Sequence, residues 1–213
     1  MKKFLMLLAI CLLSISGQAQ SLRDCWLNMP DSVMPTMGKN QHLELVDLLD
    51  MGVKAEVKNL FGEDCCLDTM SCDFLQVSSS QSSVLQVKLL PIDSTKDSLL
   101  CVVKTFMGTE KESELRFYTR QWKEMRTESF IDASMTEPCS YFSAMPDSMG
   151  LARYEELKNS VEPKMFYFAL SASDETLVAG LSLPLISVDE KKQLSALVMQ
   201  RKFKWNGTKF NID

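Results

Sequence analysis

The sequence is poor in the residues that most enzymes use for acid-base and metal chemistry. Its 213 residues include a single histidine, His42, and no glycine-rich elbow surrounds any of its serines. Its cysteines lack the two-residue spacing between ligands that is typical of zinc clusters. These absences argue against an elbow-type serine hydrolase and a structural zinc site. No catalytic, cofactor-binding or metal-binding residue is assigned from the sequence.

His42 is the one candidate for a general base. A lone histidine activates a nucleophile when a carboxylate orients it, and Ser32 or Cys25 would be that nucleophile. Nothing in the spacing brings the three residues together. We therefore favour a surface or partly buried histidine near the start of a helix, and an enzyme is the less favoured alternative.

Long apolar runs are restricted to the N-terminus. The apolar run at residues 4–15 follows two lysines and precedes small residues at 16–19, an order typical of a cleavable secretory signal. Residues 1–19 are therefore predicted to be a signal peptide, and the mature chain is expected to be periplasmic or extracellular. The run is shorter than the about 20 apolar residues that span a bilayer. No membrane span is expected in the mature chain.

The charge balance excludes one class of partner. Cleavage after Ala19 lowers the basic count from 23 to 21 against 28 acidic residues, which gives a net charge of −7. An acidic chain is ill suited to neutralising phosphates, so no nucleic-acid partner is expected. With 46% hydrophobic residues, the mature chain has enough apolar material for one domain or two small ones.

The tetrapeptide MPDS occurs twice, at residues 29–32 and 145–148, each time with an aromatic residue three positions earlier. Similar strand-forming segments, prolines and tryptophans follow both copies in the same order, which indicates an internal duplication. We predict a first α+β unit at 20–138 and a second, shorter unit at 139–213 packed with it. The matched positions are Trp26 and Phe142, Phe74 and Phe166, Pro91 and Pro184, and Trp122 and Trp205.

In the first unit, leucines and valines at three- and four-residue spacing predict two short helices within residues 40–61, separated at Gly52. Gly62 is expected to cap the second helix, and a loop over residues 65–72 leads into the strands.

Alternating apolar residues then predict a hairpin over residues 74–89, with Gln86 and Lys88 on the face away from the core. The strand at 99–106 is apolar on both faces and is expected to be central, and the strand at 115–122 follows it. Together these strands predict an antiparallel meander whose remaining face is covered by helices.

The second unit repeats this order in less space. Pro163 ends its first helix, Ser187 and Glu190 form a capping box, and Asn206 with Gly207 is a strong hairpin signal. The fold class is therefore α+β, with two tandem helix-plus-sheet repeats. The predicted elements are a helix over 148–161, strands over 165–170 and 177–185, a helix over 189–199 and a hairpin over 202–212.

Several motifs together resemble a known family. They are the signal peptide, the MPDS motif behind an aromatic residue, the Leu-Leu-Pro-Ile strand at 89–92, the strand ending in Trp122 and the C-terminal Trp-Asn-Gly hairpin at 205–210. In these features the chain resembles an exported Bacteroidales family classed only as a domain of unknown function. The resemblance spans essentially the whole mature chain. It implies export and an α+β fold, and it brings no activity or residue role.

The mature chain holds six of the seven cysteines, because Cys11 lies in the predicted signal peptide. An even number in an exported chain permits disulfides, and six allow fifteen pairings that the sequence does not resolve. Cys25 and Cys139 each precede an MPDS copy, so a bridge between them is conceivable. Free thiols are the alternative, a metal site at residues 65–72 is less favoured, and Cys101 is expected in the core. The six cysteines are Cys25, Cys65, Cys66, Cys72, Cys101 and Cys139.

Two sets of charged residues are interpreted as surface features. The basic C-terminus would guard an edge strand rather than contact an anion or polysaccharide, and the acidic pairs at helix starts would favour the helix dipole rather than form a glycosidase site. The basic residues are Arg201, Lys202, Lys204 and Lys209, and the acidic pairs are Glu155-Glu156 and Asp189-Glu190.

Asp followed by Ser or Thr, and then by an apolar residue or Thr, occurs five times, which is similar to the O-glycosylation signal of exported Bacteroidales proteins. Asp-Ser pairs also mark turns and caps, and both interpretations stay open. The five positions are 31–33, 68–70, 93–95, 97–99 and 147–149.

These observations favour a non-catalytic binding or accessory protein of the cell envelope whose partner is an envelope protein or a glycan. The alternative is a hydrolase of envelope or dietary polymers that uses His42 or an acidic pair. An enzyme should have a deep polar cleft that converges on titratable side chains, whereas a binding module should have an exposed apolar patch or groove.

Overall fold

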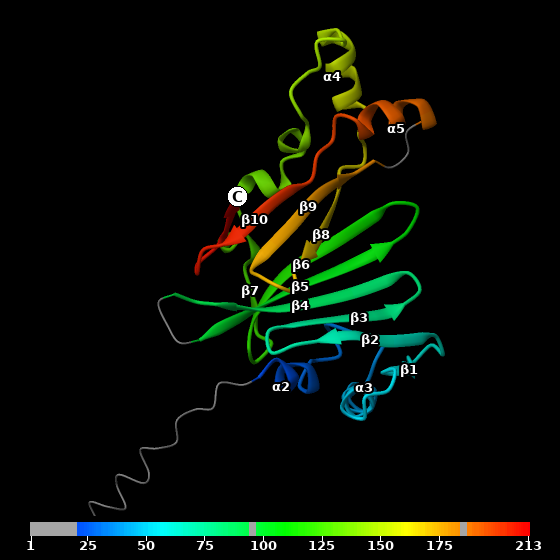
Figure 1. The fold of residues 1–213 in the computed structure, drawn as a ribbon, viewed down its shortest axis with the longest axis vertical. Helices are drawn as coiled ribbons and strands as arrows, with labels where there is room; N and C mark the ends of the chain where they lie inside the picture. The colour runs from blue at the N-terminus through cyan, green and yellow to red at the C-terminus, as the bar shows by residue number, and fades with distance from the viewer. Residues whose placement is uncertain (1–20, 94–96, 184–186) are drawn as a thin grey trace, which may run out of the picture.

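The computed structural model describes residues 21–93, 97–183 and 187–213. Two antiparallel sheets form the body of the molecule, one of seven strands in the order β1 to β7 and one of four strands in the order β11-β10-β9-β8. Figure 1 shows two short helices below the large sheet and the small sheet above it. The predicted signal peptide, residues 1–19, lies outside the described residues.

The large sheet is a meander in which each strand pairs with its sequence neighbour. Its second to sixth strands are long enough to present two full faces, and β5, which covers the strand predicted at 99–106, is an inner strand between β4 and β6. The strands are β1 (Glu56–Lys58), β2 (Asp64–Met70), β3 (Phe74–Ser80), β4 (Ser83–Pro91), β5 (Ser98–Met107), β6 (Lys111–Thr119) and β7 (Glu124–Met125).

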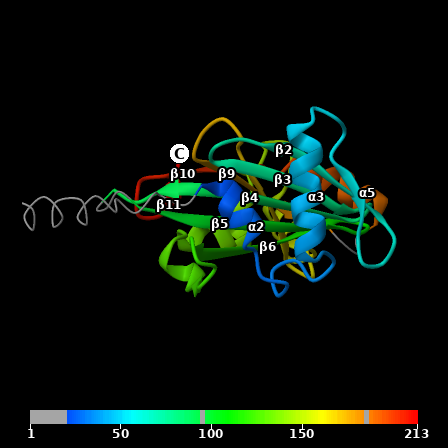
Figure 2. The ribbon, with the colours of Figure 1, turned by 90° about the horizontal axis from the view of Figure 1, so that it is seen from below.

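One face of the large sheet is covered by α2 (Leu22–Leu27) and α3 (Lys39–Asp50) (Figure 2). The helix α3 buries His42, Leu45 and Val46, which fall on one side because residues three and four apart lie on the same helical face. Tryptophan indoles join these elements. Trp26 Nε1 of α2 donates to the carbonyl of His42 on α3 at 3.0 Å, and Trp122 Nε1, in the turn after β6, donates to the carbonyl of Cys25 on α2 at 2.8 Å.

The opposite face of the large sheet packs against the small sheet, so the core has a sheet-on-sheet layer as well as a helix-on-sheet layer. The expectation that helices cover the meander therefore holds for one face only. The remaining elements are α4 (Leu151–Asn159), β8 (Met165–Leu170), β9 (Thr176–Ser182), α5 (Val188–Ser195), β10 (Arg201–Trp205), β11 (Phe210–Ile212) and the 3-10 turns at Thr127–Ser129, Ala133–Thr136 and Pro138–Tyr141.

Two predictions in the first unit are wrong. The second helix expected before Gly62 is instead strand β1, and the loop expected at residues 65–72 is largely strand β2. Val57 and Cys65 face each other across the β1–β2 pair and are buried, whereas Leu60 and Phe61, which a helix would have placed on its apolar face, are exposed. Gly62 lies in the turn between these strands with φ +82°, a conformation that favours glycine.

Most other elements confirm the sequence pattern. The hairpin of β3 and β4, the helix α4 before Pro163 and the strand β8 lie where alternation and helical spacing place them. The capping box of Ser187 and Glu190 begins α5, and β10 and β11 form the C-terminal hairpin. The α+β class is thus confirmed.

The duplication is not confirmed. The unit after the first MPDS copy contains seven strands in meander order, whereas the shorter unit has four strands with α5 inserted between β9 and β10. Trp122 stands in a turn after β6 with φ 60°, while Trp205 ends strand β10, so the two are not equivalent. The division into units at 20–138 and 139–213 stays a prediction.

Within the described residues, no helix has the length and apolar content needed to cross a bilayer.

Candidate functional site

The two sheets meet along one edge. β8 is the edge strand of the small sheet, so alternate N–H groups point away from that sheet. The N–H of Phe168 donates to Oγ of Ser113 on β6, and the N–H of Leu170 donates to Oε1 of Gln86 on β4, both at 3.0 Å. Side chains of the large sheet therefore complete the hydrogen bonding of this edge, which fixes how the two sheets dock.

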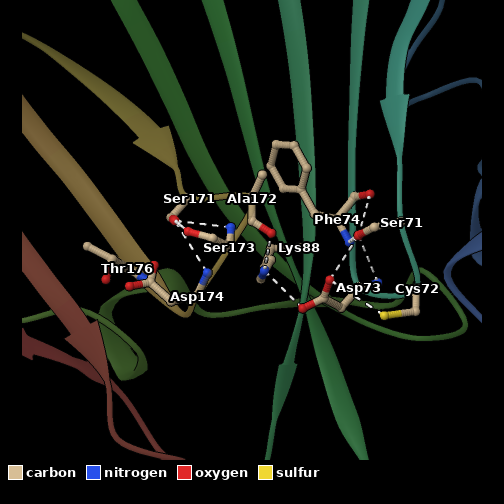
Figure 3. A network of polar contacts seen from close by, with 10 residues as sticks. All are labelled: Ser71, Cys72, Asp73, Phe74, Lys88, Ser171, Ala172, Ser173, Asp174 and Thr176. Carbon is tan, nitrogen blue, oxygen red and sulfur yellow. Dashed lines mark hydrogen bonds and ion pairs between the residues drawn. The ribbon is translucent and has the colours of Figure 1, made fainter.

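A buried charge lies beside this junction (Figure 3). The Lys88 side chain is 1% exposed, and its Nζ lies 2.9 Å from Oδ2 of Asp73 and 3.4 Å from the carbonyl of Ala172 in the β8–β9 turn. The same ammonium lies 5.8 Å from the centre of the Phe74 ring. Lys88 thus connects β4, the start of β3 and the small sheet. The prediction that it lies on the face away from the core is wrong, because the small sheet covers that face.

The Asp73 carboxylate is held ionised by its neighbours. Its partial burial alone would raise its pKa, but hydrogen bonds from Lys88 and Ser71 outweigh that effect and keep the pKa below the ordinary value of 3.8. Ser71 Oγ donates to Oδ1 of Asp73 at 2.9 Å and accepts from the N–H of Phe74 at 3.0 Å. Asp73 therefore stays a carboxylate at neutral pH, and its contact with Lys88 joins the layers.

Above this pair, the space between the sheets opens into a groove. It consists of a cavity of about 290 Å³ over β3, β4 and β5 and a cavity of about 330 Å³ toward α5. Both are lined by Lys111, Tyr167 and Gln200, so they adjoin along β8. We call this surface the inter-sheet groove. The first cavity is also lined by Gln76, Val84, Gln86, Met107, Ala169 and Val178.

Tyr167 is the central side chain of the inter-sheet groove. A Cβ built on Gly180, its partner across the β8–β9 pair, would lie 2.2 Å from Cζ of Tyr167, so the ring lies directly over the glycine. Its hydroxyl accepts a hydrogen bond from Nε2 of Gln200 at 2.8 Å. Because one face of the ring covers β9 and the ring lines both cavities, its other face borders the groove.

Charges sit at one end of the groove. Lys191 of α5 forms an ion pair with Glu110 in the β5–β6 turn, and Ser182 Oγ donates to the carbonyl of Lys111. Where the two cavities adjoin, the lining consists of Tyr167, Gln200 and the charged Lys111, and the rest of the first cavity carries amide, hydroxyl and apolar side chains. Such a surface suits stacking, packing and hydrogen bonding to a ligand rather than acid-base chemistry.

His42, the histidine considered as a general base, is fully buried on α3. Its ring centre lies 4.2 Å from that of Trp26, and neither ring nitrogen has a hydrogen-bond partner among the described residues. Burial lowers its pKa below 6.5, despite the opposing charge of Asp31. The expected helical position is confirmed and the expected exposure is wrong, because α2 covers the ring. A neutral core histidine of this kind offers no route to a substrate.

Neither proposed nucleophile is hydrogen-bonded to the His42 ring. Ser32 is exposed in the turn after α2 and lines a small cavity of about 120 Å³ with the charged side chains of Lys104 and Arg116. The Cys25 thiol is buried against the carbonyl of Arg120 at 3.7 Å, and burial raises its pKa. The structure therefore does not assemble a triad from these residues.

The six cysteines of the described chain are free thiols. The conceivable bridge between Cys25 and Cys139 is wrong, since the first is buried under α2 and the second is exposed beside the small sheet. Burial raises the pKa of Cys65 to about 12 and also raises that of Cys101, so both behave as core residues. No group of three possible metal ligands gathers among the residues that the structure describes.

The acidic pair of α4 and the basic residues near the C-terminus lie at the surface and do not form a catalytic site. Glu156 pairs with Arg153 at 2.8 Å and Glu155 with Lys158 at 3.3 Å on α4, so these acids do not face each other across a cleft. The basic residues of β10 were expected on an edge strand, which is wrong for Arg201, Lys202 and Lys204 because β10 lies between β9 and β11. Lys202 and Lys204 are exposed and Arg201 is half-buried, while Phe203 and Trp205 of the same strand face the core.

Sequence reasoning missed both Lys88 and Tyr167. For Lys88 the local pattern was misleading, because alternation with Leu85 and Val87 places it on the other face, which only the second sheet buries. For Tyr167 the signal was Gly180 inside an otherwise apolar strand, which marks close approach of another group.

Comparison with known proteins gives the fold and the family. No curated protein matches the sequence. A solved structure described as a domain of an uncharacterized protein from Porphyromonas gingivalis W83 shares the fold with a TM-score of 0.73 and 22% identity, over 90% of this chain and 97% of that one. A family model matches residues 14–210. The predicted resemblance is thereby confirmed, and the chain belongs to the family described as protein of unknown function DUF3256.

Proposed function

We propose that the protein is an exported, non-catalytic binding protein that holds a ligand of the cell envelope in the inter-sheet groove. The observation that carries this proposal is the groove itself, which consists of two adjoining cavities of about 290 and 330 Å³. Aromatic, apolar, amide and hydroxyl side chains line them, together with Lys111 in both cavities and the Lys191–Glu110 pair toward α5. Cavities of this size and mixed lining are typical of ligand sites. Export is supported by the signal-like residues 1–19.

The distribution of reactive groups favours binding over hydrolysis. His42 is buried without a hydrogen-bond partner among the described residues, on the far side of the large sheet from the groove. The acids of the α4 pair are ion-paired on an exposed helix. His42 and both acidic pairs, Glu155-Glu156 and Asp189-Glu190, are thus absent from the lining of the two cavities. Lys191 at the α5 end of the groove is paired with Glu110.

The test is to fill the groove. Ala169 lines the first cavity from β8, so Ala169→Trp places an indole where a ligand would lie. Ala152 is exposed on α4, and Ala152→Trp is the matched control. The mature chain and both variants are screened by thermal shift against soluble envelope and plant glycans and against a pool of random twelve-residue peptides.

The proposal predicts a ligand-dependent rise in melting temperature for the unmodified chain and Ala152→Trp that Ala169→Trp loses. A rise that Ala169→Trp retains would place the ligand elsewhere, and release of products from any polymer would contradict the non-catalytic role.

A further inference from the structure

We infer that the ligand of the inter-sheet groove is a carbohydrate chain and that the free face of Tyr167 is its stacking platform. This inference rests on the proposed function and adds the chemical class of the ligand. It follows from the position of the Tyr167 ring, from the amides around it and from the occupied edge of β8.

The ring of Tyr167 is held flat by the absence of a side chain beneath it. Three of its atoms lie within 2.6 Å of the position that a Cβ of Gly180 would take, so any larger residue would push the ring off the strand. Gln200 donates to the hydroxyl at 2.8 Å and fixes the outer end of the ring. A rigid aromatic face that borders a groove stacks well against the C–H face of a sugar ring, because both surfaces are flat and apolar.

Amide side chains supply the complementary hydrogen bonds. Gln76, Gln86 and Gln200 line the groove around Tyr167. An amide group both donates and accepts, as a sugar hydroxyl does, so a row of amides matches a row of hydroxyls without a net charge. Gln86 Nε2 donates to Oε1 of Gln76 at 2.8 Å, so these two side chains already form a chain of polar groups along the groove floor.

The edge of β8 argues against an extended peptide as the occupant. A peptide that adds as a strand needs unpaired N–H and C=O groups along an edge. Here the N–H groups of Phe168 and Leu170 already donate to Ser113 and Gln86. A ligand in the groove is therefore bound by side chains rather than by the backbone of β8, which favours a ligand rich in hydroxyls.

Two variants test the platform from its two sides. Tyr167→Ala removes the ring, whereas Gly180→Ala keeps it and displaces it from the strand. Gly180 is not among the residues with positive φ, so its backbone accepts alanine. Gly108→Ala, whose Cβ would meet only an ordinary contact at 3.6 Å, is the matched control. Tyr167→Phe keeps the ring and loses only the hydroxyl.

The measurement is retardation of the mature chain in native gels that contain β-1,3-glucan, β-1,4-xylan, α-1,6-mannan or N-acetylglucosamine oligomers. We expect at least one of these glycans to retard the unmodified chain, Gly108→Ala and Tyr167→Phe. In Tyr167→Ala and Gly180→Ala the dissociation constant should rise at least about tenfold, as for loss of an aromatic anchor. Circular dichroism verifies that each variant is folded.

Three results would overturn the inference. Undiminished binding by folded Gly180→Ala and Tyr167→Ala would exclude the platform, and failure of all four glycans to bind would exclude the carbohydrate class. Stabilisation by the peptide pool that Ala169→Trp abolishes would also exclude the carbohydrate class while the proposed binding function survives. If neither glycans nor peptides give a response that Ala169→Trp abolishes, both proposals fail.

Discussion

Replacing Asp73 by asparagine should destabilise the protein, because the buried Lys88 side chain then loses its anionic partner. The ammonium is 1% exposed and has Asp73 Oδ2 at 2.9 Å as its anionic partner, with a weaker contact to the carbonyl of Ala172 at 3.4 Å. Asp73→Asn keeps the shape of the side chain and removes the charge. The lysine is then left buried with neutral acceptors only.

The magnitude follows from the exposure of the two partners. Removing one partner of a fully buried pair costs about 3–5 kcal/mol. The Asp73 side chain is 39% exposed, so solvent screens part of the interaction. We therefore expect a loss of about 2–3 kcal/mol in the free energy of unfolding. For a chain of this length that loss lowers Tm by about 4–12 °C.

Urea unfolding followed by circular dichroism measures the effect. Asp64→Asn breaks the Lys58–Asp64 pair, whose side chains are 64% and 60% exposed, and is the control, with an expected change below about 0.5 kcal/mol. Lys88→Met removes the buried charge and fills the same space, so it should cost less than about 1.5 kcal/mol. Adding Lys88→Met to Asp73→Asn should recover most of the lost stability.

The pH dependence gives an independent check. Because the pKa of Asp73 in the folded chain lies below 3.8, the unfolded chain binds this proton first as the pH falls. The stabilisation is complete at neutral pH and is lost below about pH 4. Asp73→Asn should therefore show a smaller loss of stability below about pH 4 than the unmodified chain. A loss no larger than that of Asp64→Asn, or an equal loss in Lys88→Met, would refute the reasoning.

Three further results are expected. His42→Leu should leave the free energy of unfolding at pH 7 unchanged or raise it, because it removes a buried imidazole that has no hydrogen-bond partner among the described residues. Urea unfolding at pH 7 and pH 5 should also show a smaller loss of stability below pH 6.5 than in the unmodified chain, since the folded state no longer holds a histidine of lowered pKa. A large loss of stability at pH 7 would contradict this. Gly207→Ala should cost about 1–2 kcal/mol in the same assay, because φ is +88° there and Asp93 covers the position. If an Asp-Ser or Asp-Thr site is glycosylated, the intact mass from the native host exceeds that of the bare chain cleaved after Ala19, and equality with the bare mass would reject modification.

Local sequence patterns predicted most of the helices and strands. Strict alternation gave the β3–β4 hairpin, the capping box of Ser187 gave the start of α5, and Asn206 with Gly207 gave the last hairpin. The family motifs also have a structural role, since Trp205 Nε1 donates to the carbonyl of Pro91 at 2.6 Å. The Leu-Leu-Pro-Ile strand and the Trp-Asn-Gly hairpin thus meet between the two sheets.

Features that depend on distant packing could not be read locally. The stretch at residues 53–61 carries apolar residues at spacings that suit either a helix or a short strand, and pairing of β1 with β2 decides for the strand. Lys88 stands at a position that is polar in a one-layer sheet and buried once a second sheet covers it. The inter-sheet groove likewise exists only after β8 docks across the large sheet, so its residues share no sequence motif.

The location of the bound ligand tests the account most directly. With a glycan that retards the protein, amide chemical shifts of the labelled mature chain are recorded by NMR during titration. The account predicts that the largest changes occur at Tyr167, Ala169, Val178 and Gly180, which border the groove, while the amides of α4 stay unchanged. Changes centred on α3 or α4, with the groove residues unaffected, would contradict it.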